Sequence, residues 1–232
     1  MPINGFNQPI GDPLLDYTAG SYPEVTLLPG KFCRLEKLSA AQHGKDLYEV
    51  YAAEHSPMNN WTYLPIFPVA DHAEFDDLMA GYEASADPYF FAIIDTASNR
   101  AVGSVSLMRI DTANRVIEVG WVVYSDKLKR TRVATEAQYL LAKYVFDTLG
   151  YRRYEWKCDS LNEPSRKAAL RLGFQFEGIF RQAAVYKGRS RDTAWFSIID
   201  SEWPQVKARF ERWLADDNFD ENGKQRLSLS EI

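Results

Sequence analysis

Four cations fall within six consecutive positions of this chain, and they are Lys127, Lys129, Arg130 and Arg132. They follow the strand-like run VIEVGWVVY (116–124) and precede a long amphipathic stretch that begins VATEA. The first turn of a helix exposes unpaired N–H groups and the positive end of the helix dipole. Cations at that place could hold a dianion such as a pyrophosphate, although a solvated turn would explain the same charges without a ligand.

The strand-like run contains a single carboxylate, Glu118, among apolar residues. Strand alternation predicts that Glu118 and Val122 share one face of the sheet, with Trp121 on the other. A carboxylate in such a strand needs a hydrogen-bond partner or a chemical role. It could be a glutamate at a wet end of the sheet, or a general base that takes a proton from an attacking amine.

Three sequence signatures resemble the GNAT superfamily of N-acetyltransferases, and one of them is KGRSRD (187–192) with Trp203-Pro204, which is similar to the Rim-type branch. Residues 129–137, KRTRVATEA, are similar to the family's acyl-CoA loop, [Q/R]xxGx[G/A], with its frequent ATEA continuation. Asn162 and Ser165, followed by LGF (172–174) and EG (177–178), resemble the NxxS…GFxxEG pattern of the Rim-type branch, which acetylates ribosomal proteins. The likeness covers roughly 31–205.

The resemblance implies an acetyl-CoA-dependent N-acetyltransferase, in which an amine attacks the thioester directly in a ternary complex without a metal. Glu118 would be the general base. Many members place a tyrosine seven residues after the asparagine to protonate the leaving thiolate. Here that position is Ala169, so Ser165 becomes the expected donor. The residues expected to bind the cofactor are Val122, Val123, Lys129, Arg130, Thr131, Arg132, Val133, Ala134, Thr135 and Asn162.

The loop departs from the family pattern at two positions. Lys129 stands where Gln or Arg is usual, and Arg132 stands where glycine is usual. A non-glycine residue in a left-handed conformation costs roughly 1–2 kcal/mol, whereas a charge-assisted hydrogen bond to phosphate contributes roughly 1.5–3 kcal/mol. We therefore expect acyl-CoA to bind if Arg132 runs along the cofactor. The alternative is a degenerate GNAT domain that binds acyl-CoA, or nothing, and serves as an interaction module.

The acceptor is expected to be a small-molecule or peptide amine. By resemblance, the proline-rich loop 54–69 covers its pocket, and Trp61, Tyr63 and Phe67 would form the walls. Packing within the loop would explain these aromatic residues equally well.

Hydrophobic periodicity predicts the elements that must position these groups. Strands are expected at 31–39, 89–95, 101–110, 116–124, 152–159, 176–187 and 192–200, with helices in the segments 43–51, 71–82, 134–149, 162–174 and 203–214. This order indicates an α/β (α+β) fold, a single domain around a mixed, mostly antiparallel sheet of about six to seven strands flanked by helices. By family resemblance, strands 116–124 and 152–159 should splay apart to admit the cofactor.

We expect three regions: an irregular arm at 1–30, the domain at 31–215, and a polar, mobile tail at 216–232. The apolar face of the last helix, together with the arm, could build a homodimer contact.

Bulk properties exclude several classes. The net charge of −5 argues against a nucleic-acid partner. No apolar run is long enough for a membrane span, and no signal peptide is visible, so we expect a cytoplasmic protein. Cys33 and Cys158 are expected to be buried free thiols. The histidines lack metal-ligand spacing, and the absence of GxSxG makes a serine hydrolase a weak alternative.

Overall fold

The computed structural model describes residues 1–232, which form one eight-stranded sheet in the order β1-β2-β3-β4-β5-β6-β8-β7. Neighbouring strands are antiparallel except β5 and β6, which are parallel. The strands are β1 (Leu27–Pro29), β2 (Cys33–Lys37), β3 (Tyr89–Asp95), β4 (Arg100–Asp111), β5 (Val116–Tyr124), β6 (Arg153–Asp159), β7 (Gln175–Tyr186) and β8 (Arg189–Ile199).

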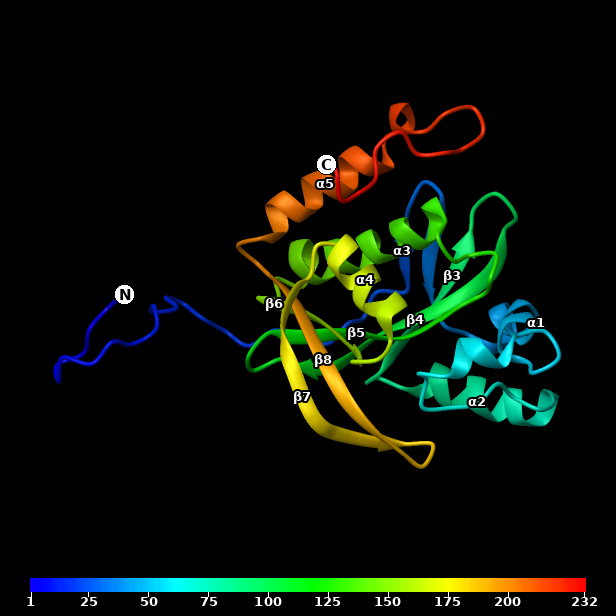
Figure 1. Cartoon of the computed structure of the whole chain (residues 1–232), viewed down its shortest axis with the longest axis horizontal. Coiled ribbons are helices and arrows are strands. Elements are labelled where there is room, and N and C mark those ends of the chain that lie inside the picture. Colours follow the sequence, from blue (N-terminus) through cyan, green and yellow to red (C-terminus); the bar gives the residue numbers. More distant parts are fainter.

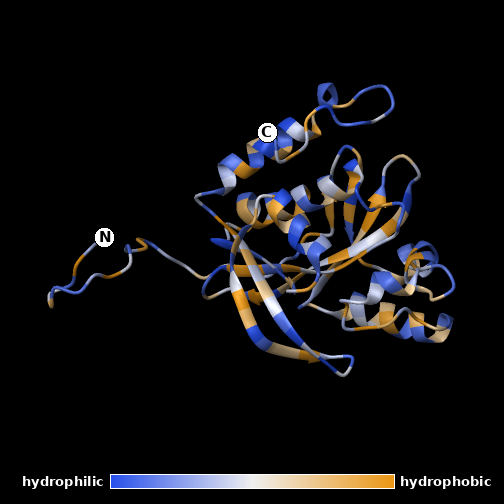
Figure 2. Cartoon of the chain, viewed as in Figure 1, coloured by the Kyte–Doolittle hydropathy of each residue, from blue (hydrophilic) through white to orange (hydrophobic).

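Helices cover both faces of the sheet (Figure 1). They are α1 (Ala40–Tyr51), α2 (His72–Ala84), α3 (Arg132–Lys143), α4 (Glu163–Arg171) and α5 (Trp203–Leu214), with short turns η1 (Met58–Trp61), η2 (Tyr144–Thr148) and η3 (Asp216–Asn218). One core lies between the sheet and α3, α4 and α5, and a second lies between β3, β4 and the pair α1 and α2. The long β7–β8 hairpin projects from the sheet, and hydrophobic and hydrophilic residues alternate along it (Figure 2).

The predicted fold class is confirmed, and the seven predicted strands all form. The eighth strand is β1, a three-residue edge that ends at Pro29. The sequence analysis placed it in the irregular arm because three residues are too few to show a period. Helix starts follow local chemistry, since the side chains of Asp71, Thr131 and Asn162 each accept a hydrogen bond from a backbone N–H of the first turn.

The alternation predicted for β5 is wrong beyond Gly120. The register of β4 and β5 shifts between Ser104 and Ser106, and Trp121 has a φ of 48°. This β-bulge inserts one extra residue into β5. Trp121 therefore packs into the core under α1 and α2, on the face of Glu118, while Val122 packs into the opposite core.

The C-terminal tail, expected to be mobile, packs on the domain. Leu229 and Asn218 are each 1% exposed, and the Asn218 amide donates to the carbonyl groups of Trp213 and Leu227. The apolar face of α5 is likewise not a free surface, because Trp203 and Phe210 lie in the main core against Tyr139 of α3.

Candidate active site

Strands β5 and β6 separate beside the start of α3. Their parallel pairing joins only Val116–Val119 to Arg153–Trp156. Beyond that point β6 continues to pair with β8, whereas β5 has a partner only on its β4 side. The expected splay is therefore present, and the bulge at Trp121 lies at its mouth.

The loop between β5 and α3 presents unpaired backbone donors at this opening. The N–H groups of Arg130, Arg132 and Val133 have no acceptor in the chain, whereas that of Ala134 bonds to the Thr131 side chain. Such a row of N–H groups at a helix start is a cradle for an anion. The residues thus fit the pyrophosphate of an acyl-CoA molecule.

The cations of this loop do not point as expected. Arg132 does not run along the cradle: its guanidinium lies 3.8 Å from the Phe32 ring centroid and 3.9 Å from that of Phe219. It also donates to the Leu214 carbonyl and, at 3.1 Å, to the Asp216 carboxylate. Arg132 therefore attaches the tail to the domain. The residue of the loop that adopts a left-handed backbone conformation is Arg130, with a φ of 63°, and not Arg132.

Lys129 points across the opening toward η1. Its ammonium lies 2.5 Å from the Asn60 side-chain oxygen and 2.7 Å from Asp126, and the Asn60 amide also donates to Asp126. Thr135 is buried and accepts a hydrogen bond from Arg171. Among the residues predicted to bind the cofactor, Arg130, Arg132 and Val133 are the ones whose backbone N–H groups remain unpaired at the opening.

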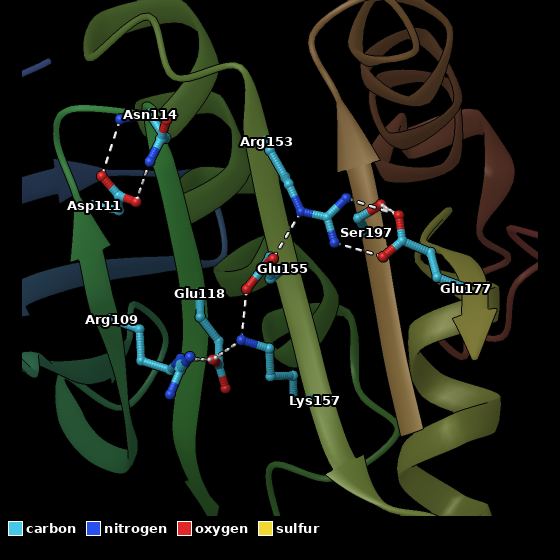
Figure 3. Close-up of polar contacts among 9 residues, drawn as sticks. All are labelled: Arg109, Asp111, Asn114, Glu118, Arg153, Glu155, Lys157, Glu177 and Ser197. Atoms are coloured by element: carbon cyan, nitrogen blue, oxygen red, sulfur yellow. Dashed lines mark hydrogen bonds and ion pairs between the residues drawn. The ribbon is translucent and has the colours of Figure 1, made fainter. Parts of the chain in front are cut away.

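Glu118 stands in a row of charges on one face of the sheet (Figure 3). Its Oε2 lies 2.9 Å from Lys157 Nζ and 3.3 Å from Arg109 Nε. Lys157 also lies 2.6 Å from Glu155, the residue that faces Glu118 in the β5–β6 register. Arg153 in turn links Glu155 to Glu177.

This environment has a direct electrostatic effect on Glu118. Its side chain is 8% exposed, and burial raises the pKa of its carboxyl above the ordinary 4.5, while Lys157 and Arg109 oppose that rise. A raised pKa moves a carboxylate toward the range where it can exchange protons near neutral pH. Glu118 therefore has the burial and the partners that a tuned general base needs.

Ser165 lies in the first turn of α4, beside the splayed end of β6. Its Oγ accepts a hydrogen bond from Trp156 Nε1 at 3.0 Å, and its N–H donates to Asn162 Oδ1 at 3.2 Å. Trp156 occupies one acceptor position of the hydroxyl, and the Ser165 side chain also hydrogen-bonds to the Cys158 thiol, which lowers the pKa of that thiol against the effect of burial. Burial raises the pKa of the nearby Cys158 thiol, and Cys33 is buried too, so both free cysteines are shielded.

The three aromatic residues proposed for the acceptor pocket have different surroundings. Trp61 is 1% exposed, donates to Ser56, and packs on Tyr51 in the second core. The Tyr63 hydroxyl donates to the Leu161 carbonyl at 3.1 Å. This hydrogen bond joins the loop 54–69 to the segment that follows β6. Phe67 is 57% exposed.

The charged partners of Glu118 were not predicted from the sequence. Lys157 and Glu155 alternate on β6 in the run EWKC, so their sharing of one face was readable, but their register with Glu118 was not. Lys187 and Arg189 belong to the third family signature but were not predicted as site residues; they lie at the tip of the β7–β8 hairpin and reach the loop that contains Trp61.

Comparisons with known proteins agree with this geometry. Residues 34–175 match the acetyltransferase (GNAT) domain family. A crystal structure of a GCN5-related N-acetyltransferase from Brucella melitensis superposes with a TM-score of 0.91 and 49% identity, covering 94% of this chain and 98% of that one.

Two curated relatives extend the comparison. An uncharacterized N-acetyltransferase, p20, of Bacillus licheniformis is 30% identical over 61% of this chain and 80% of its own length. A ribosomal-protein-serine acetyltransferase of Escherichia coli is 23% identical over 70% of this chain and 91% of its own.

Proposed function

The chain belongs to the GNAT acetyltransferase family and is an N-acetyltransferase, and we propose that it transfers the acetyl group of acetyl-CoA to a primary amine by direct attack. The observation that carries this proposal is the row of unpaired N–H groups at Arg130, Arg132 and Val133, beside the splay of β5 and β6. Acetyl-CoA supplies the activated acetyl thioester.

Binding rests on the cradle and the splay. The backbone N–H groups hold the pyrophosphate, and Val122 and Val123 lie on the unpaired stretch of β5, alongside which the pantetheine arm would extend. Asn162 caps α4, the helix that follows β6, and so helps to fix the β6 side of the opening.

Proton transfer rests on Glu118 and Ser165. An amine attacks only when neutral, and the ordinary pKa of a lysine side chain is near ~10.4, so a base must remove a proton as the bond forms. Glu118 accepts that proton, directly or through a water molecule. The Ser165 hydroxyl donates to the departing thiolate, because Trp156 fixes the orientation of its oxygen.

A calorimetric titration with acetyl-CoA tests the binding half of the proposal. We expect saturable binding that Val133→Pro weakens, because proline removes a cradle N–H and is compatible with the first turn of a helix. Arg130→Ala, which removes an exposed charge but keeps its N–H, is the matched control. Absence of binding to the unmodified chain would show a GNAT-shaped module without this chemistry.

A second assay tests the transfer. Release of CoA thiol in the presence of a panel of amines, with mass spectrometry of the products, should reveal N-acetylated acceptors. Acetyl-CoA binding without any transfer, across small amines and peptide N-termini alike, would contradict the catalytic half.

A further inference from the structure

A pocket of about 270 Å³ lies where the tip of the β7–β8 hairpin meets the loop between α1 and α2. Its lining residues are Met58, Trp61, Thr62, Phe67, Lys187 and Arg189. Two of these are cations, and none is acidic. That imbalance is unusual in a chain of net charge −5.

Both cations are held in place by the loop. Lys187 Nζ donates to the Trp61 carbonyl at 2.6 Å and lies 4.1 Å from the centroid of the Phe67 ring. Arg189 Nη2 donates to the Thr62 carbonyl at 2.9 Å. A lysine has three donor hydrogens and an arginine five, so most of their capacity stays unused.

The two charges also lack a counter-ion. Neither forms an ion pair, and burial together with the nearby Arg189 lowers the pKa of Lys187. Arg189 is exposed and Lys187 is half-buried, so water screens part of their repulsion, and a bound anion would relieve the rest. An arginine and a lysine that share a pocket are the usual partners of carboxylate and phosphate groups.

The pocket is on the acceptor side of the proposed active site. Tyr186, the residue before Lys187, donates to the buried carboxylate of Asp159 at 2.8 Å. Asp159 lies two residues along β6 from Lys157, the partner of Glu118, which is about 7 Å along a strand. The Tyr186–Asp159 contact therefore anchors the hairpin tip on the strand that carries Lys157, and an acceptor bound at Glu118 can extend toward the pocket.

We propose that Lys187 and Arg189 bind an anionic group, a carboxylate or a phosphate, on the far end of the acceptor amine. The inference rests on the proposed function and names the class of acceptor: an amine that carries a negative charge some distance from its nitrogen. The chain as a whole is acidic, but the local charge at the site decides which group is recognised.

Matched acceptor pairs test the proposal. The probes are ω-amino acids of increasing chain length and Gly-X dipeptides, each compared with its carboxamide, and ω-aminoalkyl phosphates compared with the corresponding amino alcohols. We expect the anionic member of the best pair to have a kcat/KM about 10- to 100-fold higher, the loss that follows removal of one charge-assisted hydrogen bond. Whether the carboxylate or the phosphate series responds identifies the source of the anion.

Variants then assign the effect. Lys187→Met and Arg189→Gln should remove the preference for the anionic member and leave the neutral member and the affinity for acetyl-CoA unchanged. Lys187→Arg should restore part of the preference. Arg181→Gln, which removes an exposed charge from the same hairpin, should change nothing.

Three results would overturn the proposal: equal rates for both members of every pair, a preference for the neutral members, or an equal loss for both members in Lys187→Met, which would mark a structural clamp. Failure of the proposed function itself looks different, because acetyl-CoA would then fail to bind or no amine would be acetylated.

Discussion

The Glu118 carboxylate and the Lys157 ammonium form an ion pair, 2.9 Å from Oε2 to Nζ, with both side chains less than one-tenth exposed. The same ammonium contacts Glu155 at 2.6 Å and lies 3.8 Å from the centroid of the Trp195 ring. One cation therefore serves two carboxylates that face each other across β5 and β6. It opposes the rise in the pKa of Glu118 that burial causes.

The pairing of Glu118 and Glu155 on one lysine supplies a matched test of the general base. Glu118→Gln should lower kcat about 10²- to 10⁴-fold, the usual contribution of acid–base catalysis. Glu155→Gln removes the same charge from the same lysine and should change kcat far less. Both variants should bind acetyl-CoA normally in calorimetry. Equal losses in the two variants would assign the effect to the charge network and not to proton transfer by Glu118.

Lys157 should set the pH dependence of the reaction. The base acts only when ionised, so activity rises with pH through the pKa of Glu118, which burial raises and Lys157 lowers. Lys157→Met removes the lowering influence, and the acid limb of kcat/KM should move to higher pH. Lys207→Met, which breaks an ion pair with Asp147 outside the site, is the control. An acid limb that stays in place in Lys157→Met would contradict the assignment.

Arg132 should contribute to stability through its place between two rings. Arg132→Ala loses the contacts with Phe32 and Phe219 and the hydrogen bonds to the tail, and should lower the free energy of unfolding by about 2–3 kcal/mol. Arg130→Ala removes the same charge from an exposed position and should change it by less than about 0.5 kcal/mol. Urea unfolding of the two variants makes the comparison. Similar values would mean that the ring contacts contribute little.

Gly120 lies against the Met108 side chain of β4. A Cβ at this position would lie 2.2 Å from the sulfur of Met108. Gly120→Ala should therefore displace the Met108 side chain, and because Met108 is flexible and half-buried the fold should lose only about 1 kcal/mol of stability. Combining it with Met108→Ala should recover part of that loss, so a double-mutant cycle in urea should show favourable coupling. Additive effects would point to a backbone requirement at the bulge instead.

The regular part of the fold was readable from the sequence because it depends on local periodicity. The strands around Glu118 and the caps at Asp71 and Asn162 follow from patterns a few residues long. The bulge at Trp121 was not readable, because a bulge is defined by the count of residues on the partner strand. Nothing near Arg132 in the sequence marked its role either, since its aromatic partners come from opposite ends of the chain.

The residues of the candidate site likewise fall into two groups, those that local sequence indicates and those that only the folded chain brings together. Family motifs located Glu118, Ser165 and the start of α3, whose chemistry is carried by single residues or by the backbone. Lys157 and the pair Lys187 and Arg189 act through register and through the reach of a hairpin, which only the folded chain defines.

The unpaired N–H groups at the start of α3 also have a consequence for ionic strength. Two of the four neighbouring cations, Lys129 and Arg132, are already neutralised inside the chain by Asp126 and Asp216. Mobile ions screen exposed charges strongly and short hydrogen bonds far less. The loop, which looks like a patch of charge in the sequence, therefore offers mainly backbone N–H dipoles to a ligand. It should select a polyanion by the fit of its shape to these groups, and should do so in concentrated salt as well as in dilute buffer.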